Sequence, residues 1–313
     1  VSIPEIHRLH LDQPLAGAVL GFGGDLKCAV ALGKGRDVLV YEPVGDVAEP
    51  ANQDRLEAHV RALLKAHGRD VAALACDLHP GYFSSKLCRR IADETGLRRV
   101  EVQHHRAHVA ATAAEHGLAS APLVGLAFDG TGYGDDGVIW GGEFFSGSVS
   151  GRMERRGSFA PLTLCGGDAA VRAPWRMALA FMIENGFDSP KIEAWARQVG
   201  VRLPDLDLFR RALHLGLQCS KTTALGRWFD CFSALWGVCA EVEFEAQAAI
   251  ELQRAAESYD GGCFLGPCTV RWLDDRLAVI TFEEFLGDVG SQFGQRADLA
   301  LTDTAIEVRY RGQ

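Results

Sequence analysis

The sequence lacks the features that would indicate a nucleic-acid-binding or membrane protein. It has 32 lysines and arginines against 41 aspartates and glutamates, which gives a net charge of −9. Because phosphate backbones are bound by clustered basic residues, this balance argues against nucleic acid and anionic membranes as partners. No apolar run reaches membrane-spanning length. The N-terminal sequence VSIPEIHRLH has no apolar core of the kind found in signal peptides.

Several familiar catalytic motifs are also missing. There is no Walker A loop, no G-x-G-x-x-G segment after a strand and no nucleophile elbow. Nine cysteines are present, but none forms a C-x-x-C pair and none has a paired histidine that would mark a thiol nucleophile. Most of them lie in apolar surroundings. We therefore expect reduced, buried thiols in a cytoplasmic protein.

Alternating apolar strands and amphipathic helices in the first half predict an α/β fold. Residues 17–41 have the pattern of strands separated by glycine-rich turns. Ser84 and Ser85 are typical N-caps for the helix that follows them. A helix is expected from about residue 104 to 116, and a hairpin with a glycine-lined mouth over 123–145.

The second half is expected to be more helical. A hairpin is predicted over 269–281 and a last strand over 306–310, where apolar and charged residues alternate. Four helices are predicted at 176–185, 205–217, 226–238 and 244–258.

Two histidines provide the first candidate site. His104 and His108 are one helical turn apart and therefore share one face of the expected helix. Two neutral imidazoles at this spacing can bind one transition metal ion. Surface or capping histidines near a helix start give the same pattern, so the spacing alone leaves both interpretations open. His105 points to another face, where a supporting or structural role is expected.

A glycine-rich segment follows an apolar strand and opens with a carboxylate: Asp129-Gly130-Thr131-Gly132-Tyr133-Gly134. Glycines allow backbone N–H groups to reach phosphate oxygens without a side-chain clash. Asp129 can bind a metal directly or through water. An ordinary hairpin loop has the same composition, so this pattern is weak by itself.

Three further segments are candidate anion or ligand sites. The turn from Gly21 to Lys27 could approach an anion, and His79 and Tyr82 follow a buried strand whose end could line a cleft. Gly166-Gly167-Asp168 precedes a helix and could bind a ribose hydroxyl or a phosphate. Its neighbours Arg172 and Arg176 could clamp an anion. Solvated arginines beside a helix-entry turn are an equally good explanation.

Five segments together resemble one known family: VQHHRAHVAATAAEHGL, FDGTGYGDDGVIWGGEFF, GGDAAVRAPWRMALA, ACDLHPGYFSS and GRWFDCFSALWGV. They are similar to the C-terminal, TsaD-like carbamoyltransferase domain of HypF, which matures nickel–iron hydrogenases. The resemblance spans about residues 15–253. It implies an actin-like (ASKHA) α/β fold with two subdomains around a nucleotide cleft, at residues 1–120 and 121–313.

The resemblance also implies a reaction. In HypF-like proteins a YrdC-like domain makes carbamoyl-adenylate from carbamoyl phosphate and ATP. The TsaD-like domain then passes the carbamoyl group to the C-terminal cysteine of HypE, where it becomes a cyanide ligand of the iron. Two alternatives are a small-molecule O-carbamoyltransferase with the same cleft and a non-catalytic nucleotide-binding remnant.

The site residues follow from the same resemblance. His104, His108 and Asp129 are expected to bind a divalent metal, either iron or zinc, and Lys27 and Asp129 are expected to be catalytic. ATP or carbamoyl-adenylate is expected to contact a third group of residues: Gly130, Thr131, Gly132, Tyr133, Gly134, Gly166, Gly167, Asp168, Gly226, Arg227 and Asp230.

The chain departs from the family pattern in three places. Cys28 and Ala29 follow Lys27 where the family has Asn and Thr, and Arg106 stands where a third histidine is usual. After about Ala255 the resemblance fades, and the late Asn-Asp-Gly-Gly turn that would supply another metal ligand is not found. These differences predict an incomplete second subdomain, as in a fragment, a truncated homologue or a degenerate copy.

Overall fold

The computed structural model describes residues 3–258, 269–272 and 278–281. Two compact units divide the chain. Unit 1 comprises Val1–Ala127, Gly132–Asp136 and Phe145–Glu154. Unit 2 comprises Phe128–Thr131, Gly137–Phe144 and Arg155–Gln313. The chain therefore passes from one unit to the other several times, and neither unit is a single continuous segment.

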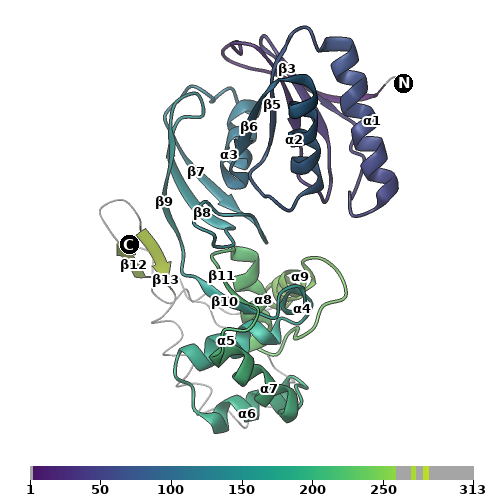
Figure 1. Ribbon diagram of the computed structural model, residues 1–313. Coiled ribbons are helices and arrows are strands. Elements are labelled where there is room, and N and C mark those ends of the chain that lie inside the picture. The colour runs from purple at the N-terminus through teal and green to yellow at the C-terminus, as the bar shows by residue number, and fades with distance from the viewer. Residues whose placement is uncertain (1–2, 259–268, 273–277, 282–313) are drawn as a thin grey trace. The chain divides into compact units, whose positions relative to one another are not determined.

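Unit 1 is built on a six-stranded sheet in the order β1-β4-β3-β2-β5-β6 (Figure 1). The strands from β1 to β2 pair antiparallel, whereas β2 with β5 and β5 with β6 pair parallel. The parallel pairs place the carboxyl ends of β5 and β6 at one edge of the sheet. The strands are β1 Glu5–His10, β2 Ala18–Phe22, β3 Val30–Lys34, β4 Asp37–Tyr41, β5 Val71–Asp77 and β6 Arg98–Val102.

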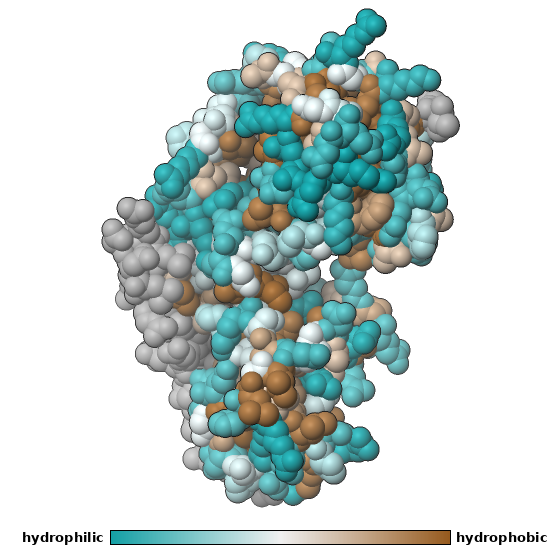
Figure 2. Space-filling view, in the orientation of Figure 1, coloured by the Kyte–Doolittle hydropathy of each residue, from teal (hydrophilic) through white to brown (hydrophobic). Residues whose placement is uncertain are grey.

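Helices α1 (Pro50–His67) and α2 (Phe83–Thr95) pack against this sheet and against each other. Their apolar faces, with Leu56 and Ile91 fully buried, join the inward side chains of the strands in one core. Their outer faces are hydrophilic (Figure 2) and carry ion pairs between the two helices, such as Arg90 with Glu57. Helix α3 (His104–Glu115) contacts β1.

The N-terminus of α2 is capped differently from the sequence prediction. Ser84 and Ser85 lie inside the helix and are buried, so they are not its N-caps. Instead, the carboxylate of Asp25 accepts hydrogen bonds from the backbone N–H groups of Phe83 at 2.7 Å and Ser84 at 3.1 Å. A distant carboxylate thus satisfies N–H groups that have no partner within the helix. The turn from Gly21 to Lys27 brings this anion to the helix.

A second sheet has the order β12-β13-β9-β8-β7. The predicted pairing of the two strands within 123–145 is confirmed, although β8 begins at Gly142 and not at Val138. The predicted antiparallel pairing within 269–281 is confirmed for β12 and β13, while 273–277 and the predicted strand 306–310 lie outside the described residues. The strands are β7 Leu123–Phe128, β8 Gly142–Gly147, β9 Met153–Phe159, β12 Thr269–Trp272 and β13 Ala278–Thr281.

Helix α5 (Trp175–Glu184) contacts β10, α4, α7 and α8, and it buries seven residues because it is apolar on nearly every side. Indole N–H groups join its neighbours: Trp195 donates to the carbonyl of Ala234 at 3.2 Å. No helix in the described ranges is long and apolar enough to cross a bilayer. The remaining elements of unit 2 are β10 Leu162–Cys165, α4 Asp168–Arg172, α6 Ser189–Gln198, α7 Leu203–His214, β11 Cys219–Thr222, α8 Leu225–Leu235 and α9 Gln247–Glu257.

One pair of cysteines corrects the expectation that all the thiols are reduced. Cys165 and Cys219 face each other in the antiparallel pair β10–β11 and are joined by a disulfide. The register places their Cα atoms 4.1 Å apart although 54 residues separate them in sequence. The other cysteines within the described residues are free and buried, as predicted.

Candidate functional site

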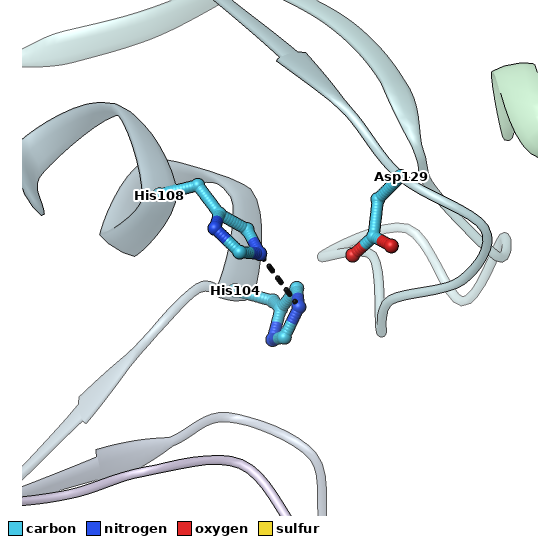
Figure 3. Close-up of side chains that lie close together, drawn as sticks. All are labelled: His104, His108 and Asp129. Carbon is cyan, nitrogen blue, oxygen red and sulfur yellow. Dashed lines mark hydrogen bonds between the residues drawn. The ribbon is translucent and has the colours of Figure 1, made fainter. Parts of the chain in front are cut away.

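The two predicted metal-binding histidines face each other in unit 1. The chain leaves β6 at Val102, and Gln103 caps α3 by accepting a hydrogen bond from the N–H of Arg106 at 3.0 Å. His104 and His108 then lie on successive turns of the helix. Their Nε2 atoms are 3.2 Å apart (Figure 3). Two imidazole nitrogens at this distance can bind one cation together.

A carboxylate lies behind the first histidine. Oδ2 of Asp77, at the end of β5, is 2.6 Å from Nδ1 of His104. Oδ1 of the same carboxylate accepts the backbone N–H of His79 at 2.7 Å. The Asp77 side chain is only 8% exposed and that of His104 is 20% exposed. His104 therefore directs Nδ1 into the protein and Nε2 toward His108.

His105 has the structural role that its direction on the helix suggested. It is fully buried, and its Nδ1 lies 3.1 Å from Nε2 of Gln103. The same Gln103 amide donates to the carbonyl of Tyr133 at 3.0 Å. A methyl group on Gly132 would overlap the His105 ring and would lie 3.1 Å from Cδ2 of His104. In unit 1 the glycine loop thus closes onto the histidine helix.

Aromatic rings surround the loop that follows Asp77. The rings of His79 and Tyr82 stack with centroids 4.2 Å apart, and Tyr133 meets His79 edge-on at 5.3 Å. The backbone N–H of Gly81 donates to Nδ1 of His79 at 3.0 Å. Lys27, one of the predicted catalytic residues, is exposed and forms no hydrogen bond or ion pair among the described residues. Its side chain is free to meet a ligand.

Some of the predicted residues of unit 2, Gly130, Gly226 and Arg227, contact Asp129 or its neighbour, and Asp129 follows β7 and is also labelled in Figure 3. The Asp129 N–H donates to the carbonyl of Gly141 at 2.8 Å, and its carbonyl accepts the N–H of Gly226 at 3.3 Å. Its carboxylate Oδ1 accepts the N–H of Gly130 at 2.6 Å. The backbone of Asp129 is thus fixed on both sides.

Close backbone approach explains the glycines around Asp129. A methyl group on Gly226 would lie 3.0 Å from Cα of Gly130, and one on Gly141 would lie 2.6 Å from the Asp129 carbonyl. Real side chains do not pack at such distances without displacement of the backbone. These glycines therefore serve, first of all, to let three segments of backbone meet.

Glu143 is a further residue of this region that the sequence reasoning did not identify. It is fully buried at the start of β8. One oxygen accepts the N–H groups of Gly141 and Gly142, each at 3.2 Å, and the hydroxyl of Thr223. The other accepts Nε of Arg155 at 2.6 Å. An acidic residue inside an otherwise apolar strand was the one available signal.

Arg227 and Asp230 form a second ion pair beside the glycine loop. Nε of Arg227 donates to the carbonyl of Gly130 at 2.9 Å, and its guanidinium pairs with the Asp230 carboxylate. Burial raises the pKa of Asp230 to about 6, and the charge of Arg227 opposes that shift. Asp230 therefore acts on Arg227, and Arg227 in turn holds the loop at Gly130.

The predicted segment Gly166-Gly167-Asp168 lies elsewhere in unit 2, directly after the disulfide-bonded Cys165. Both glycines have positive φ, 108° and 53°, so the turn requires them. A methyl group on Gly166 would lie 3.1 Å from a guanidinium nitrogen of Arg176. The structure thus brings Arg176 to this turn, while Arg172 is exposed.

Comparison with known proteins gives the family of this chain. The model of the HypF Kae1-like domain matches residues 15–115. The model described as carbamoyltransferase, Kae1-like domain, second subdomain, matches residues 125–299, more than half of the chain.

A curated relative covers most of the sequence. The carbamoyltransferase HypF homolog of Cupriavidus necator is 38% identical over 273 residues, which are 86% of this chain and 67% of that protein. The chain belongs to the HypF family. Carbamoyltransferase HypF of Synechocystis is 34% identical over 255 residues, 78% of this chain.

Solved HypF structures share the fold. The crystal structure of full-length HypF in its phosphate- and nucleotide-bound form aligns with a TM-score of 0.78 and 28% identity over 92% of this chain. HypF of T. kodakarensis aligns with a TM-score of 0.76 at 23% identity. Together with the mixed α/β architecture, these HypF neighbours confirm the predicted actin-like fold class.

The chain corresponds to only part of the HypF proteins that it matches. It spans 36% of the nucleotide-bound structure and 33% of the Synechocystis relative. The two family models and the Cupriavidus relative confirm the predicted family. The roles of single residues, the metal, the nucleotide and the partner proteins stay predictions.

Proposed function

We propose that this chain is a carbamoyl-transfer module of the HypF type that acts in the maturation of nickel–iron hydrogenases. In this proposal it takes the carbamoyl group from carbamoyl-adenylate, supplied by a YrdC-like domain, and transfers it to the C-terminal cysteine of HypE in the cytoplasm. Family membership supports the reaction class. The facing Nε2 atoms of His104 and His108, with Asp77 behind the first ring, are the observation that carries the proposal.

The donor set fits a divalent metal. His104 and His108 offer Nε2 atoms on one helix face of unit 1. Asp129 of unit 2 is proposed as a third ligand on the basis of the family resemblance. Imidazole and carboxylate together suit iron or zinc. A carboxylate behind a histidine is also the usual support of a metal-bound imidazole. When bound, the metal would polarise the carbamoyl carbonyl and offset negative charge on the leaving phosphate.

The chain's own groups have separate tasks in this proposal. The loops 130–134 and 166–168 are the proposed contacts of the nucleotide, through backbone N–H groups other than those of Gly130 and Gly166, which already donate to Asp129 and Gln218. Lys27 of unit 1 is exposed and forms no hydrogen bond or ion pair among the described residues, so its ammonium is available to an anionic ligand. Arg227 fixes the loop through the carbonyl of Gly130. The attacking thiolate belongs to HypE, so no internal nucleophile is needed.

A transfer assay tests the proposal. The chain is incubated with Zn²⁺ or Fe²⁺, carbamoyl-adenylate and HypE, and the C-terminal peptide of HypE is examined by mass spectrometry for a carbamoylated cysteine. We expect transfer by the wild type and by His116→Ala, which changes an exposed histidine just after α3. We expect His104→Ala and His108→Ala to lose it.

Two results would contradict the proposal in different ways. Carbamoylation of a small-molecule hydroxyl, with HypE unmodified, would identify an O-carbamoyltransferase. Nucleotide binding without transfer to either acceptor, with metal present, would identify a non-catalytic nucleotide-binding module.

A further inference from the structure

We infer that Asp77 is the positioning residue of the proposed metal site: it holds His104 in the tautomer whose Nε2 carries the lone pair that would bind the ion. This inference rests on the metal site proposed above and adds a residue to it. Asp77 does not reach the ion in this scheme, because its carboxylate lies on the Nδ1 side of the His104 ring.

The sheet places the carboxylate behind the histidine. Strands β5 and β6 run parallel, and Asp77 is the register partner of Val102, the last residue of β6. Helix α3 begins at His104, two residues after Val102. The end of β5 therefore lies beside the first turn of α3, the helix that follows β6. The hydroxyl of Ser85 donates to the Asp77 carbonyl at 2.9 Å and anchors the strand end.

The two carboxylate oxygens have different partners. Oδ1 accepts the backbone N–H of His79, which can only donate, at 2.7 Å. Oδ2 lies 2.6 Å from Nδ1 of His104. An ionised carboxylate accepts and does not donate, so Nδ1 of His104 must carry the hydrogen. In the neutral ring Nε2 then has the lone pair, and this is the nitrogen that faces His108.

The tautomer decides whether a metal can bind. A neutral imidazole with hydrogen on Nε2 cannot use that nitrogen as a ligand without first moving the proton. A carboxylate that accepts from Nδ1 removes this cost, fixes the ring orientation and makes the ligand nitrogen more basic. Asp77 would thus fix the tautomer and the ring orientation of His104 in the metal-free protein.

Replacing Asp77 by asparagine separates this role from simple packing. The amide has nearly the same shape but offers one oxygen acceptor and one NH₂ donor. The donors at His79 and His104 meet different oxygens of Asp77, so an amide can place its one oxygen at only one of these two positions. If His79 keeps its bond, the amide donates to Nδ1, and His104 changes to the tautomer with hydrogen on Nε2.

The experiment measures both the tautomer and the affinity. In metal-free protein with ¹⁵N-labelled histidine rings, we expect His104 of the wild type to have a protonated Nδ1 and an unprotonated Nε2. Titration with Zn²⁺ against a competing chelator should show a Kd that rises ~10- to 100-fold in Asp77→Asn. The matched control is Asp37→Asn, because Asp37 also contacts Nδ1 of a histidine, His10, at 3.1 Å, but is exposed at the surface. We expect it to bind like the wild type.

Each outcome bears on a separate claim. If the wild type and the control bind no Zn²⁺, the metal site of the proposed function is wrong. If they bind, His104→Ala does not, and Asp77→Asn binds like the wild type, the metal site stands and the inference about Asp77 is overturned. If Asp77→Asn does not fold, the ¹⁵N spectrum of the metal-free wild type tests the inference by itself. A His104 ring protonated on Nδ1 supports the inference, and a ring protonated on Nε2 overturns it.

Discussion

The Cα of Gly132 lies so close to the ring of His105 that no side chain fits between them. His105 is fully buried and cannot move aside without disturbing the start of α3. This contact joins the glycine loop to the helix that carries both candidate metal ligands.

Gly132→Ala should therefore destabilise unit 1. An extra methyl group in a well-packed site costs about 1–3 kcal/mol through displaced neighbours. Urea unfolding should show the loss of free energy. Gly21→Ala is the control, because its new methyl group would meet only one atom at an ordinary distance of 3.7 Å. Equal stability of the two variants would show that the loop and His105 do not pack as described.

Metal should stabilise the protein through the two histidines of α3. A ligand that binds only the folded state at 100 times its Kd adds ~2.7 kcal/mol. We expect Zn²⁺ to raise the melting temperature of the wild type and of His116→Ala, and EDTA to reverse the rise. His108→Ala should show little or no rise. A rise of the same size in His108→Ala would place the metal elsewhere.

Glu143→Ala should be among the most damaging substitutions in unit 2. It would remove the buried carboxylate that accepts from Nε of Arg155 and from the N–H groups of Gly141 and Gly142. Breaking a buried ion pair in this way costs about 3–5 kcal/mol.

The control for Glu143 is a surface ion pair. Glu193→Ala removes the exposed pair with Arg197 on α6 and should change stability by less than ~1 kcal/mol. Thermal or denaturant unfolding measures both variants. A loss of similar size in the two would mean that the Glu143 network contributes no more than a surface pair.

Asp230 should make the stability of the folded chain decrease as the pH rises from about 4 to about 6. Its pKa is raised by burial to about 6, so the folded state keeps a proton that the unfolded state has already released. The stabilisation is complete below the unfolded pKa of 3.8 and is lost as the pH passes about 6. The size is up to ~3 kcal/mol, from about two pKa units.

Asp230→Asn should remove that part of the pH dependence, because an amide does not titrate. Asp207→Asn, which changes an exposed partner of Arg210 on α7, should keep the wild-type profile. Urea unfolding at pH values from 4 to 7 gives the profiles, and parallel curves for wild type and Asp230→Asn would contradict the raised pKa.

Local patterns predicted much of the fold and part of the site. The spacing of His104 and His108 placed both rings on one face of α3, and the glycines before Glu143, unusual in a strand, mark a place where backbone segments meet closely. Each of these two patterns involves only residues that are close together in the sequence. Periodicity and glycine content report such local features directly.

Contacts between distant residues were not predictable in this way. Asp25 caps a helix 58 residues later in the chain, and Cys165 meets Cys219 only because β10 pairs with β11 in one register. His79 and Tyr82 were singled out after the buried strand, but the bond of the preceding Asp77 to His104 depends on the parallel register of β5 and β6. Register is a property of the folded sheet, and a single sequence does not specify it locally.

The interleaving of the two units limits how this protein can be divided. A polypeptide ending at Glu154 would retain all of unit 1 together with Asp129 and Glu143 of unit 2. It would lack Gly226, Thr223 and Arg155, the groups that hold those two residues in place. The other polypeptide would lack Phe128–Thr131 and Gly137–Phe144, the parts of unit 2 that precede Glu154 in the sequence. Reassembly of two separately expressed halves should therefore require both pieces to fold together, and neither half is expected to be a self-sufficient module.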